Sequence, residues 1–405
     1  MEVNKLLSVY KRVSQTELNR IKTNSLGALA KKRRISLHMT QGEVADKICS
    51  ISYLSKVETN KIIPNDRCIT ALMEKVKISK WEIYTIENSK ELIELAIKRI
   101  LYNEIDEYSE LYERVYDVET NQCADTIKIG YYLLNNNIKE AEKLIIDNIN
   151  IASSMDRYVL SLFLYLTSVY LLKIGQFKEL ELIFKEEKTI YINDELDALY
   201  DELAFEYYSK IKRPVLTKEY YDNLIKLYKD RMIYQKIDDV TLKYALFLLK
   251  EDEYEKAIKA CISLRKEEYF KQNPLYNYIL GKSYYMIDKK ITAKDYLYSI
   301  GSDSEYYPYI IEMKYDISKD KTQVYEEASQ SYTLNQSFYL DYFMKKEAGL
   351  LSRKTFDSKE YNDLYSKADY YTKIDMLNKE QEYLIEQKKY KDAISIEKRK
   401  TKILK

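Results

Sequence analysis

The stretch TQGEVADKICSISYLSKVE, residues Thr40–Glu58, decides the fold of the N-terminal part of the chain. Thr40 followed three residues later by Glu43 is a capping box, which predicts that a short helix begins here. A turn near Cys49–Ser50 separates this helix from a second one. The residues expected to face the core are Val44, Ala45 and Ile48 in the first helix and Leu54 and Val57 in the second.

The second helix leaves Ser50, Ile51, Tyr53 and Lys56 on its outer face. A short helix, a turn and a second helix with small polar residues at its exposed start is how a helix-turn-helix presents side chains to the major groove of DNA. We therefore expect these four residues to face the groove. The alternative for Ile51 and Tyr53 is packing at a domain or dimer contact. Lys56 is the candidate for a base contact, because the helix has no Arg or Gln.

The composition favours an all-α protein. Seven Gly and four Pro in 405 residues are too few for β-rich or Gly-loop architectures, and 46% hydrophobic residues are ample for a packed core. The length allows more than one domain. We therefore expect helices joined by short turns.

Charge is unevenly distributed along the chain. Residues 1–80 carry 16 Lys+Arg and 7 Asp+Glu, a net charge of +9, whereas the rest carries 50 and 58, a net charge of −8. A basic N-terminal part on an acidic body is what binding to the phosphate backbone predicts for the N-terminal part alone. The alternative is a solvated surface whose charge is uneven by chance.

Several functional classes find no support in the sequence. Neither a signal peptide nor an apolar run long enough to span a membrane is present. The widely separated Cys49, Cys68, Cys123 and Cys261 suit reduced thiols in a cytoplasmic protein. A single histidine, His38, and the lack of a P-loop, a GxSxG or a dinucleotide fingerprint predict no metal, no cofactor and no enzymatic activity.

From about residue 121 the chain repeats itself. A small or apolar anchor recurs at spacings typical of tetratricopeptide-like helix pairs. The anchors are Ala141, Leu180, Ala257, Ala293, Ala328 and Ala393, with weaker units near Tyr220 and Tyr361. In the best unit, LYNYILGKSYYMIDKKITAKDYL, Gly281 and Ala293 allow two helices to approach closely. Stacked pairs form a right-handed superhelix with a concave inner surface.

The N-terminal pattern LGxxxKxxR…MTQxxVA…ICxxSxLSKVE resembles the phage-repressor, or XRE-type, helix-turn-helix. The short turn at Ile48–Cys49 is similar to the variant found in the RRNPP peptide-sensing regulators, the PlcR- and NprR-like proteins. The resemblance covers about 55 residues closely. It implies an all-α chain in which a lambda-repressor-like helix-turn-helix domain is followed by a tetratricopeptide-like right-handed α-superhelix.

The pattern and the resemblance together give a set of DNA-binding residues. Gln41 stands at the start of its helix, where family members contact a phosphate, and Lys31, Arg34 and Lys61 are further phosphate partners. A solvated helix face is the alternative for Lys31–Arg34. Ser52, Ser55 and Glu58 are assigned structural roles. The complete predicted set is Lys31, Arg34, Gln41, Ser50, Ile51, Tyr53, Lys56 and Lys61.

The repeat register places one face of the first helix of each pair on the concave wall. The predicted peptide-binding residues are Tyr165, Glu202, Phe205, Lys250, Asn277, Tyr278, Lys282 and Tyr285. Ordinary packing between repeats is the alternative for each. The resemblance implies that Asn side chains hold the peptide backbone, which draws attention to Asn277. The run Asn135–Asn137 is interpreted as a polar turn between helices.

We expect four segments and one principal function. The segments are an N-terminal extension (1–24), an XRE-type domain with a fifth helix beginning at Trp81 (25–88), a linker helix (89–120) and a repeat domain for peptide binding and dimerisation (121–405). The resemblance implies a cytoplasmic, homodimeric transcriptional regulator that binds a palindromic operator in double-stranded DNA and is switched by a short quorum-sensing peptide. One alternative is an adaptor whose repeats bind a partner protein. Another is a repeat-based phosphatase.

Overall fold

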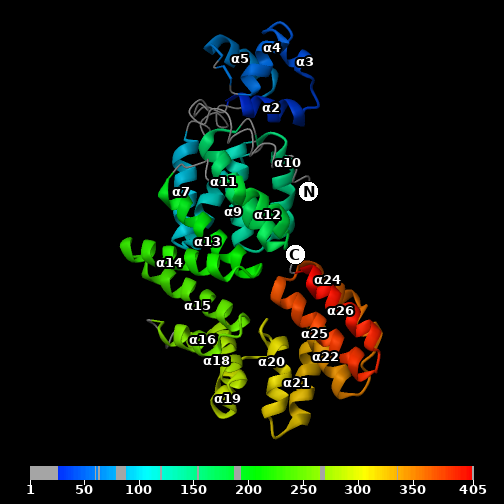
Figure 1. The fold of residues 1–405 in the computed structure, drawn as a ribbon. Coiled ribbons are helices and arrows are strands. Elements are labelled where there is room, and N and C mark those ends of the chain that lie inside the picture. Colours follow the sequence, from blue (N-terminus) through cyan, green and yellow to red (C-terminus); the bar gives the residue numbers. More distant parts are fainter. Residues whose placement is uncertain are drawn as a thin grey trace. The chain divides into compact units, whose positions relative to one another are not determined.

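The computed structural model is all-α in the residues that it describes (Figure 1). These residues are 26–59, 61–62, 64–78, 88–118, 121–152, 155–186, 193–264, 270–334 and 336–403. The predicted N-terminal extension and the predicted helix beginning at Trp81 lie outside them. The contacts divide the chain into two compact units, Met1–Ala204 and Phe205–Lys405. Each unit is built from helices joined by short turns.

In the residues that the structure describes, the first unit contains four N-terminal helices and the beginning of the repeats. Its helices are α2 (Leu26–Ser36), α3 (Gln41–Ala45), α4 (Ile51–Glu58), α5 (Asp66–Lys75), α7 (Ser89–Leu101), α8 (Ile105–Val115), α9 (Gln122–Leu134), α10 (Ile138–Ile149), α11 (Arg157–Lys173), α12 (Phe177–Glu186) and the first part of α13 (Asp194–Lys210). The division between units falls inside α13, within the predicted repeat domain. Stacked repeats contact only their neighbours, so such an array can divide at any junction where local contacts are few.

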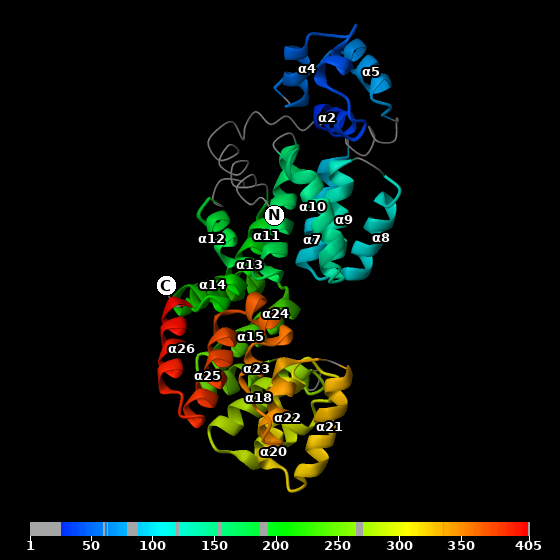
Figure 2. The ribbon, with the colours of Figure 1, turned by 90° about the vertical axis from the view of Figure 1, so that its right-hand side faces the viewer.

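The second unit continues the repeats to the end of the described chain. It contains the rest of α13, α14 (Pro214–Asp230), α15 (Tyr234–Lys250), α16 (Tyr254–Ile262), α18 (Pro274–Met286), α19 (Lys290–Tyr298), α20 (Tyr307–Ile317), α21 (Lys321–Leu334), α22 (Phe338–Glu347), α23 (Arg353–Phe356), α24 (Lys359–Lys367), α25 (Tyr370–Glu386) and α26 (Tyr390–Ile403). Figure 2 shows α25 and α26 in orange and red.

The predicted capping box at the start of α3 is confirmed. Thr40 Oγ1 accepts a hydrogen bond from the Glu43 backbone N–H at 3.2 Å, and Glu43 Oε2 accepts one from the Thr40 N–H at 2.6 Å. α3 is shorter than expected, because it ends at Ala45, where Asp46 leaves the helical conformation with ψ 124°, and Lys47 then turns the chain with φ 63°. Four of the five expected core residues, Val44, Ala45, Leu54 and Val57, are buried, whereas Ile48 is half-buried and packs against their cluster.

The predicted linker helix is two helices, α7 and α8, rather than one. Asn103, with φ 56°, turns the chain between them. Both helices bury apolar side chains, such as Ile97 and Leu111, and both pack against α9. The segment is therefore part of the helical stack. Helical spacing alone did not reveal the break because Asn at a helix end can adopt the left-handed conformation without glycine.

The expected repeats appear as helix pairs, with every predicted anchor buried in the second helix of its pair. α9 pairs with α10, α11 with α12, α15 with α16, α18 with α19, α20 with α21, and α25 with α26. The anchors Ala141, Leu180, Ala257, Ala293, Ala328 and Ala393 are at most 4% exposed. The run Asn135–Asn137 forms the predicted turn between α9 and α10, with Asn136 at φ 57°.

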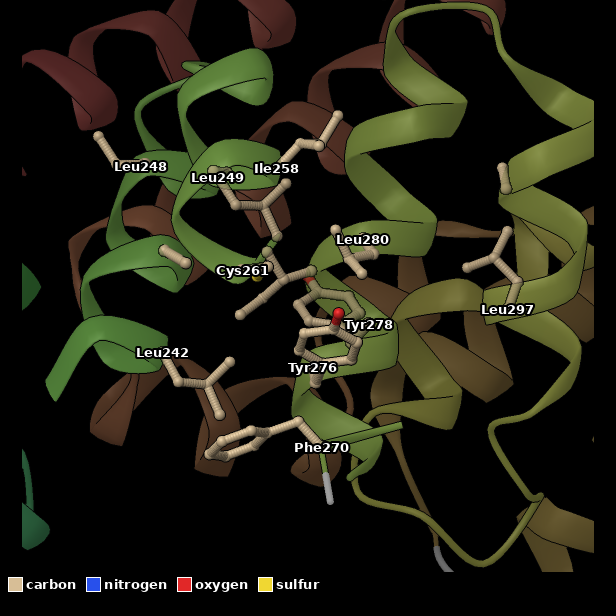
Figure 3. Packing of buried hydrophobic residues seen from close by; sticks show 14 of the residues in the cluster. Leu242, Leu248, Leu249, Ile258, Cys261, Phe270, Tyr276, Tyr278, Leu280 and Leu297 are labelled. Carbon is tan, nitrogen blue, oxygen red and sulfur yellow. The ribbon is translucent and has the colours of Figure 1, made fainter. Parts of the chain in front are cut away.

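Successive pairs share one core. Figure 3 shows the cluster between α15, α16, α18 and α19, where Leu249, Cys261 and Leu280 meet between the helices. Cys261 and Leu280 are completely buried. Burial of several such side chains, each contributing about 1.5–3 kcal/mol, offsets the entropy lost when the helices are ordered. The core fixes the rotation of α15 and α18, and with it the face that each turns away from the core.

The α18–α19 contact depends on a glycine. A Cβ at Gly281 would lie 2.7 Å from Leu297 Cδ2 and 2.9 Å from Leu297 Cγ, and Leu297 is itself fully buried. We therefore predict that Gly281→Ala destabilises the protein. Overpacking costs about 1–3 kcal/mol, more than the roughly 0.5–1 kcal/mol that alanine normally adds to a helix interior. The free energy of unfolding, measured with urea and circular dichroism, tests this.

Gly42→Ala is the matched control. A Cβ at Gly42 would meet its nearest neighbours at 3.8 Å, an ordinary contact distance. This variant should be as stable as the wild type or slightly more stable. Equal stability of Gly281→Ala and the wild type would contradict the close approach of α18 and α19.

Candidate functional site

A cavity of about 530 Å³ lies within the second unit. The first helices of successive repeats form its wall: α15 contributes Leu246 and Lys250, α18 contributes Tyr278 and Lys282, and α25 lies across from them with Asp375. Tyr278 also belongs to the hydrophobic core that α15 and α18 share, and Leu246 packs against this core, so both side chains are anchored in the helices that form the wall. A cavity of this size suits a small ligand or a short extended segment.

The C-terminal helices close this cavity onto α15. Lys250 Nζ forms an ion pair with Asp369 Oδ2 at 2.5 Å, and the two residues are 119 positions apart in the sequence. Tyr371, at the start of α25, donates a hydrogen bond from its hydroxyl to Glu251. Asp369 is also the N-cap of α25, since its Oδ1 accepts from the Thr372 backbone N–H at 2.8 Å. One carboxylate thus begins α25 and attaches it to α15.

The pKa of Asp369 results from opposing influences of burial and of its partners on the carboxylate. Burial, the largest single influence, raises it, but the Lys250 ammonium and the hydrogen bonds from Thr372 together hold the pKa below its usual value. Asp369 is therefore ionised at neutral pH. The closing interaction is a charge-assisted pair, which is stronger than a hydrogen bond between neutral groups.

Tyrosine dominates the lining. The cavity tyrosines are Tyr278, Tyr306, Tyr309, Tyr339, Tyr370 and Tyr371. The rings of Tyr278 and Tyr306 stack with centroids 5.3 Å apart, and those of Tyr309 and Tyr339 lie 4.8 Å apart. Burial raises the pKa of Tyr309 to about 12, so its hydroxyl stays protonated. Such rings offer apolar faces to a ligand and hydroxyls that donate or accept hydrogen bonds.

A second cavity, of about 480 Å³, lies next along the repeats. It shares Glu305 and Tyr309 with the first, and α24 contributes Lys359 and Asp363 to its wall. The two cavities therefore border the same pair of side chains. A ligand too long for the first cavity has a continuation beside Tyr309.

Three of the eight predicted peptide-binding residues line the first cavity: Lys250, Tyr278 and Lys282. Tyr285, on the same helix, donates its hydroxyl hydrogen bond to Asp316 at 2.9 Å instead. Asn277 is buried, and its Nδ2 donates to the Lys271 carbonyl at 2.8 Å, so it finds a partner within the fold.

The remaining three predicted residues lie elsewhere. Tyr165 and Glu202 belong to the first unit, where the Tyr165 ring packs edge-on against Tyr200. Phe205 is buried in the second unit and packs against Tyr221, with ring centroids 6.4 Å apart. The structure therefore does not bring these three to the cavity.

Several lining residues were missed in the sequence, six of them on α25. The repeat register could have found one of them: Tyr278 stands fifteen residues before the anchor Ala293, and Asn378 stands fifteen residues before the anchor Ala393. Asp375 and Tyr371 had no comparable signal, because they reach the cavity only through the closing contact with α15.

The second candidate surface is the outer face of α4. Ser50 is the N-cap of α4, with its Oγ accepting from the Tyr53 N–H at 3.1 Å. Ile51 is 56% exposed, and Lys56 and Lys61 are exposed as well. Tyr53 and Lys31 are half-buried, and Tyr53 packs partly on the core formed by Val44 and its neighbours. Four predicted DNA-binding residues, Ser50, Ile51, Lys56 and Lys61, are thus exposed around α4.

Glu58 holds three of the N-terminal helices together. Its buried carboxylate accepts from Arg34 Nε at 2.6 Å and Arg34 Nη2 at 3.0 Å, and from Gln41 Nε2 at 2.8 Å. The structural role expected for Glu58 is therefore confirmed. The same contacts place the side chains of Arg34 and Gln41, both predicted phosphate partners, on Glu58, where they position α2 and α3 relative to α4.

Among the residues that the structure describes, no group of three or more His, Cys, Asp and Glu side chains could hold a metal ion. None of the helices formed by these residues is both long and apolar enough to cross a membrane.

Comparison with known structures identifies the fold. The chain is similar to the crystal structure of a Rap protein complexed with Competence and Sporulation Factor, with a TM-score of 0.59 and 17% sequence identity, over 78% of this chain and 97% of that one. At this identity the likeness shows the fold alone. No family model and no curated protein matches the sequence.

Two other solved structures match weakly. One is a bacterial peptide pheromone/receptor complex, with a TM-score of 0.24 and 16% identity, covering 54% of this chain and 97% of that one. The other is Bacillus thuringiensis PlcR in complex with the peptide PapR7 and DNA, with a TM-score of 0.20 and 14% identity, covering 81% of this chain and 100% of that one. Their TM-scores are too low to carry an argument.

The Lys250–Asp369 ion pair leads to a testable prediction about how α25 is held against α15. Asp369→Asn keeps an oxygen for the helix cap but removes the charge, which leaves a partly buried Lys250 without its partner. We expect a loss of about 1–3 kcal/mol in the free energy of unfolding at pH 7. Because the pKa of Asp369 is lowered, the wild type should keep this contribution above the usual carboxyl pKa and lose it only as the pH falls through the lowered value.

Asp316→Asn is the matched control. Asp316 pairs with Lys290 at 2.7 Å, but both side chains are nearly half exposed, so the loss should be much smaller. Urea unfolding at pH 7 and in acid measures both variants. An Asp369→Asn protein as stable as Asp316→Asn at pH 7 would contradict the closing role of the ion pair.

Proposed function

We propose that this chain is a DNA-binding transcriptional regulator, switched by a short signalling peptide that binds in the cavity of the second unit. The observation that carries the proposal is the cavity itself. It combines six tyrosines with lysine, carboxylate and amide side chains on the concave-side helices of the repeats. Such a wall can bury apolar side chains of an extended peptide and pair its polar groups.

The Rap likeness supports a binding role for this fold. That protein was crystallised with Competence and Sporulation Factor, so a chain of the same fold holds a signalling factor. The resemblance of the repeats and of the N-terminal motif to RRNPP regulators points in the same direction. We propose accordingly that the chain acts by binding rather than by catalysis.

The proposed DNA contact uses the outer face of α4. The basic N-terminal part supplies non-specific attraction to phosphates. Ser50, Ile51, Tyr53 and Lys56 would enter the major groove, while Arg34, Gln41 and Glu58 hold the orientation of α4 relative to α2 and α3. In a homodimer, the two α4 helices would meet half-sites about 34 Å apart, so a small change in the repeats can alter the fit.

DNA binding can be tested with a pool of double-stranded DNA whose central sequence is randomised. Sequences retained by the wild type are enriched and measured by fluorescence anisotropy. Lys56→Ala should weaken binding to an enriched sequence by about 10- to 100-fold, because a good base contact is worth about 1–3 kcal/mol. Helicity should not change, since Lys56 is exposed.

Lys75→Ala is the control, because Lys75 is an exposed lysine in the last turn of α5, outside the proposed contact. It should retain most of the affinity. Full retention of sequence-specific binding by Lys56→Ala would show that the assignment of α4 to the groove is wrong. Enrichment of no sequence by the wild type would reject the DNA-binding proposal.

Peptide binding can be tested by calorimetric titration with synthetic peptides derived from any short secreted peptide encoded beside the gene. We expect saturable binding that Tyr278→Ala weakens, because the Tyr278 ring forms part of the wall. The matched control is Tyr298→Ala, on α19 outside the cavity. Absence of binding by every such peptide would favour the adaptor alternative, in which the repeats bind a partner protein.

A further inference from the structure

The charged groups of the first cavity differ in how well they are partnered. Two of the four carboxylates on its wall accept a tyrosine hydroxyl: Tyr371 donates to Glu251 and Tyr254 to Asp252. The other two, Glu305 and Asp375, act electrostatically on Tyr306 and Tyr339. Among the three lysines, Lys250 has the carboxylate of Asp369 as its partner, and the exposed Lys212 lies over the Tyr370 ring, 5.2 Å from its centroid. Glu251 and Asp252 therefore have partners within the fold.

Lys282 is different. An ammonium group has three N–H donors. In the described structure, Lys282 Nζ makes one long hydrogen bond, to Tyr278 Oη at 3.5 Å, and lies 5.8 Å from the centroid of the same ring. Asp375 and Asp252 act on it electrostatically, yet the described residues place no carboxylate within the 4.0 Å of an ion pair. The group is half-buried on the cavity wall, so water replaces the missing partners only in part.

Lys282 is protonated and positively charged at neutral pH. The Tyr278 hydroxyl, the largest influence, raises the pKa of this lysine in spite of its burial. The neighbouring tyrosines have their own pKa values raised, mainly by burial, so they remain neutral. Lys282 is consequently a cation with donors to spare on the cavity wall.

We propose that Lys282 binds a carboxylate group of the ligand, so that the cavity selects a peptide carrying a carboxylate at this position. The inference rests on the proposed peptide-binding function. An ammonium–carboxylate pair in a partly buried cavity is shielded from solvent and gains a charge-assisted hydrogen bond. The carboxylate can belong to the C-terminus of the peptide or to an Asp or Glu side chain, and the experiment below distinguishes the two.

The probe is a library of short random-sequence peptides with free C-termini. The full-length wild-type protein retains its ligands, which are identified by mass spectrometry and measured by calorimetry. Each retained peptide is then compared with two derivatives. In one the C-terminus is amidated, and in the other each Asp or Glu is replaced by Asn or Gln. The derivative that loses affinity identifies the source of the carboxylate.

One of the two derivatives should bind the wild type about 10- to 100-fold more weakly, the worth of a hydrogen bond to a charged group. Lys282→Met should weaken the original peptide by a similar factor and should no longer distinguish it from that derivative. A general loss of structure would weaken both peptides equally. Lys282→Arg should retain the preference for the carboxylate.

Lys290→Met is the matched control, because Lys290 is an exposed lysine that pairs with Asp316 outside the cavity. It should bind both peptides as the wild type does. Lys282→Met should also unfold at the same urea concentration as the wild type, since no ion pair is lost.

The outcomes separate the inference from the proposed function. If peptides are retained but both derivatives bind the wild type as tightly as the original, the cavity is a peptide site and the role of Lys282 is overturned. The same holds if Lys282→Met still discriminates fully between acid and neutral peptides. If the wild type retains no peptide at all, the proposed function fails and this inference fails with it.

Discussion

A small side chain where the two helices of a repeat meet is the constraint on which the second unit depends. Ala257 and Ala293 are completely buried, and the absence of a Cβ at Gly281 lets α18 approach Leu297 on α19. Close approach of the helices sets the rotation of each about its axis. That rotation decides which side chains enter the core and which face the cavity, so the position of Lys282 follows from the packing of its neighbours.

The contact between α25 and α15, which closes the cavity, is a second constraint, and it is polar rather than apolar. The repeats pack through apolar contacts between neighbours, whereas α25 meets α15 through the Lys250–Asp369 ion pair and the Tyr371–Glu251 hydrogen bond. These polar contacts are weaker than a buried apolar core and depend on exact geometry. A ligand that contacts both walls can favour the closed arrangement or a more open one. The helices of the repeats are rigid supports, and the closing contact is the element that a ligand can shift.

Local rules in the sequence accounted for much of the fold. Three short-range signals in the sequence are present in the structure: the capping box at Thr40, the helical spacing of the buried positions in α4, and the small anchors of the repeats. The break between α7 and α8 was not predicted, because Asn103 turns the chain without the glycine or proline that usually marks such a place.

The cavity was only partly predictable. The periodicity of single repeats gave Lys250, Tyr278 and Lys282, which all line the cavity, and Tyr278 belongs to the hydrophobic core as well. It also selected Tyr285 and Asn277, which find partners inside the fold. Asp375 comes to the site through a contact between residues far apart in the sequence, and no local pattern reports such a contact.

The central claim is that occupancy of the cavity controls DNA binding, which is a coupling free energy between two sites. The most direct measurement is the affinity of the wild type for its selected DNA sequence, determined by fluorescence anisotropy first without peptide and then with saturating peptide. The account predicts a change of about 5- to 150-fold, in one direction or the other. Equal affinities, with calorimetry showing that the peptide is bound, would contradict it.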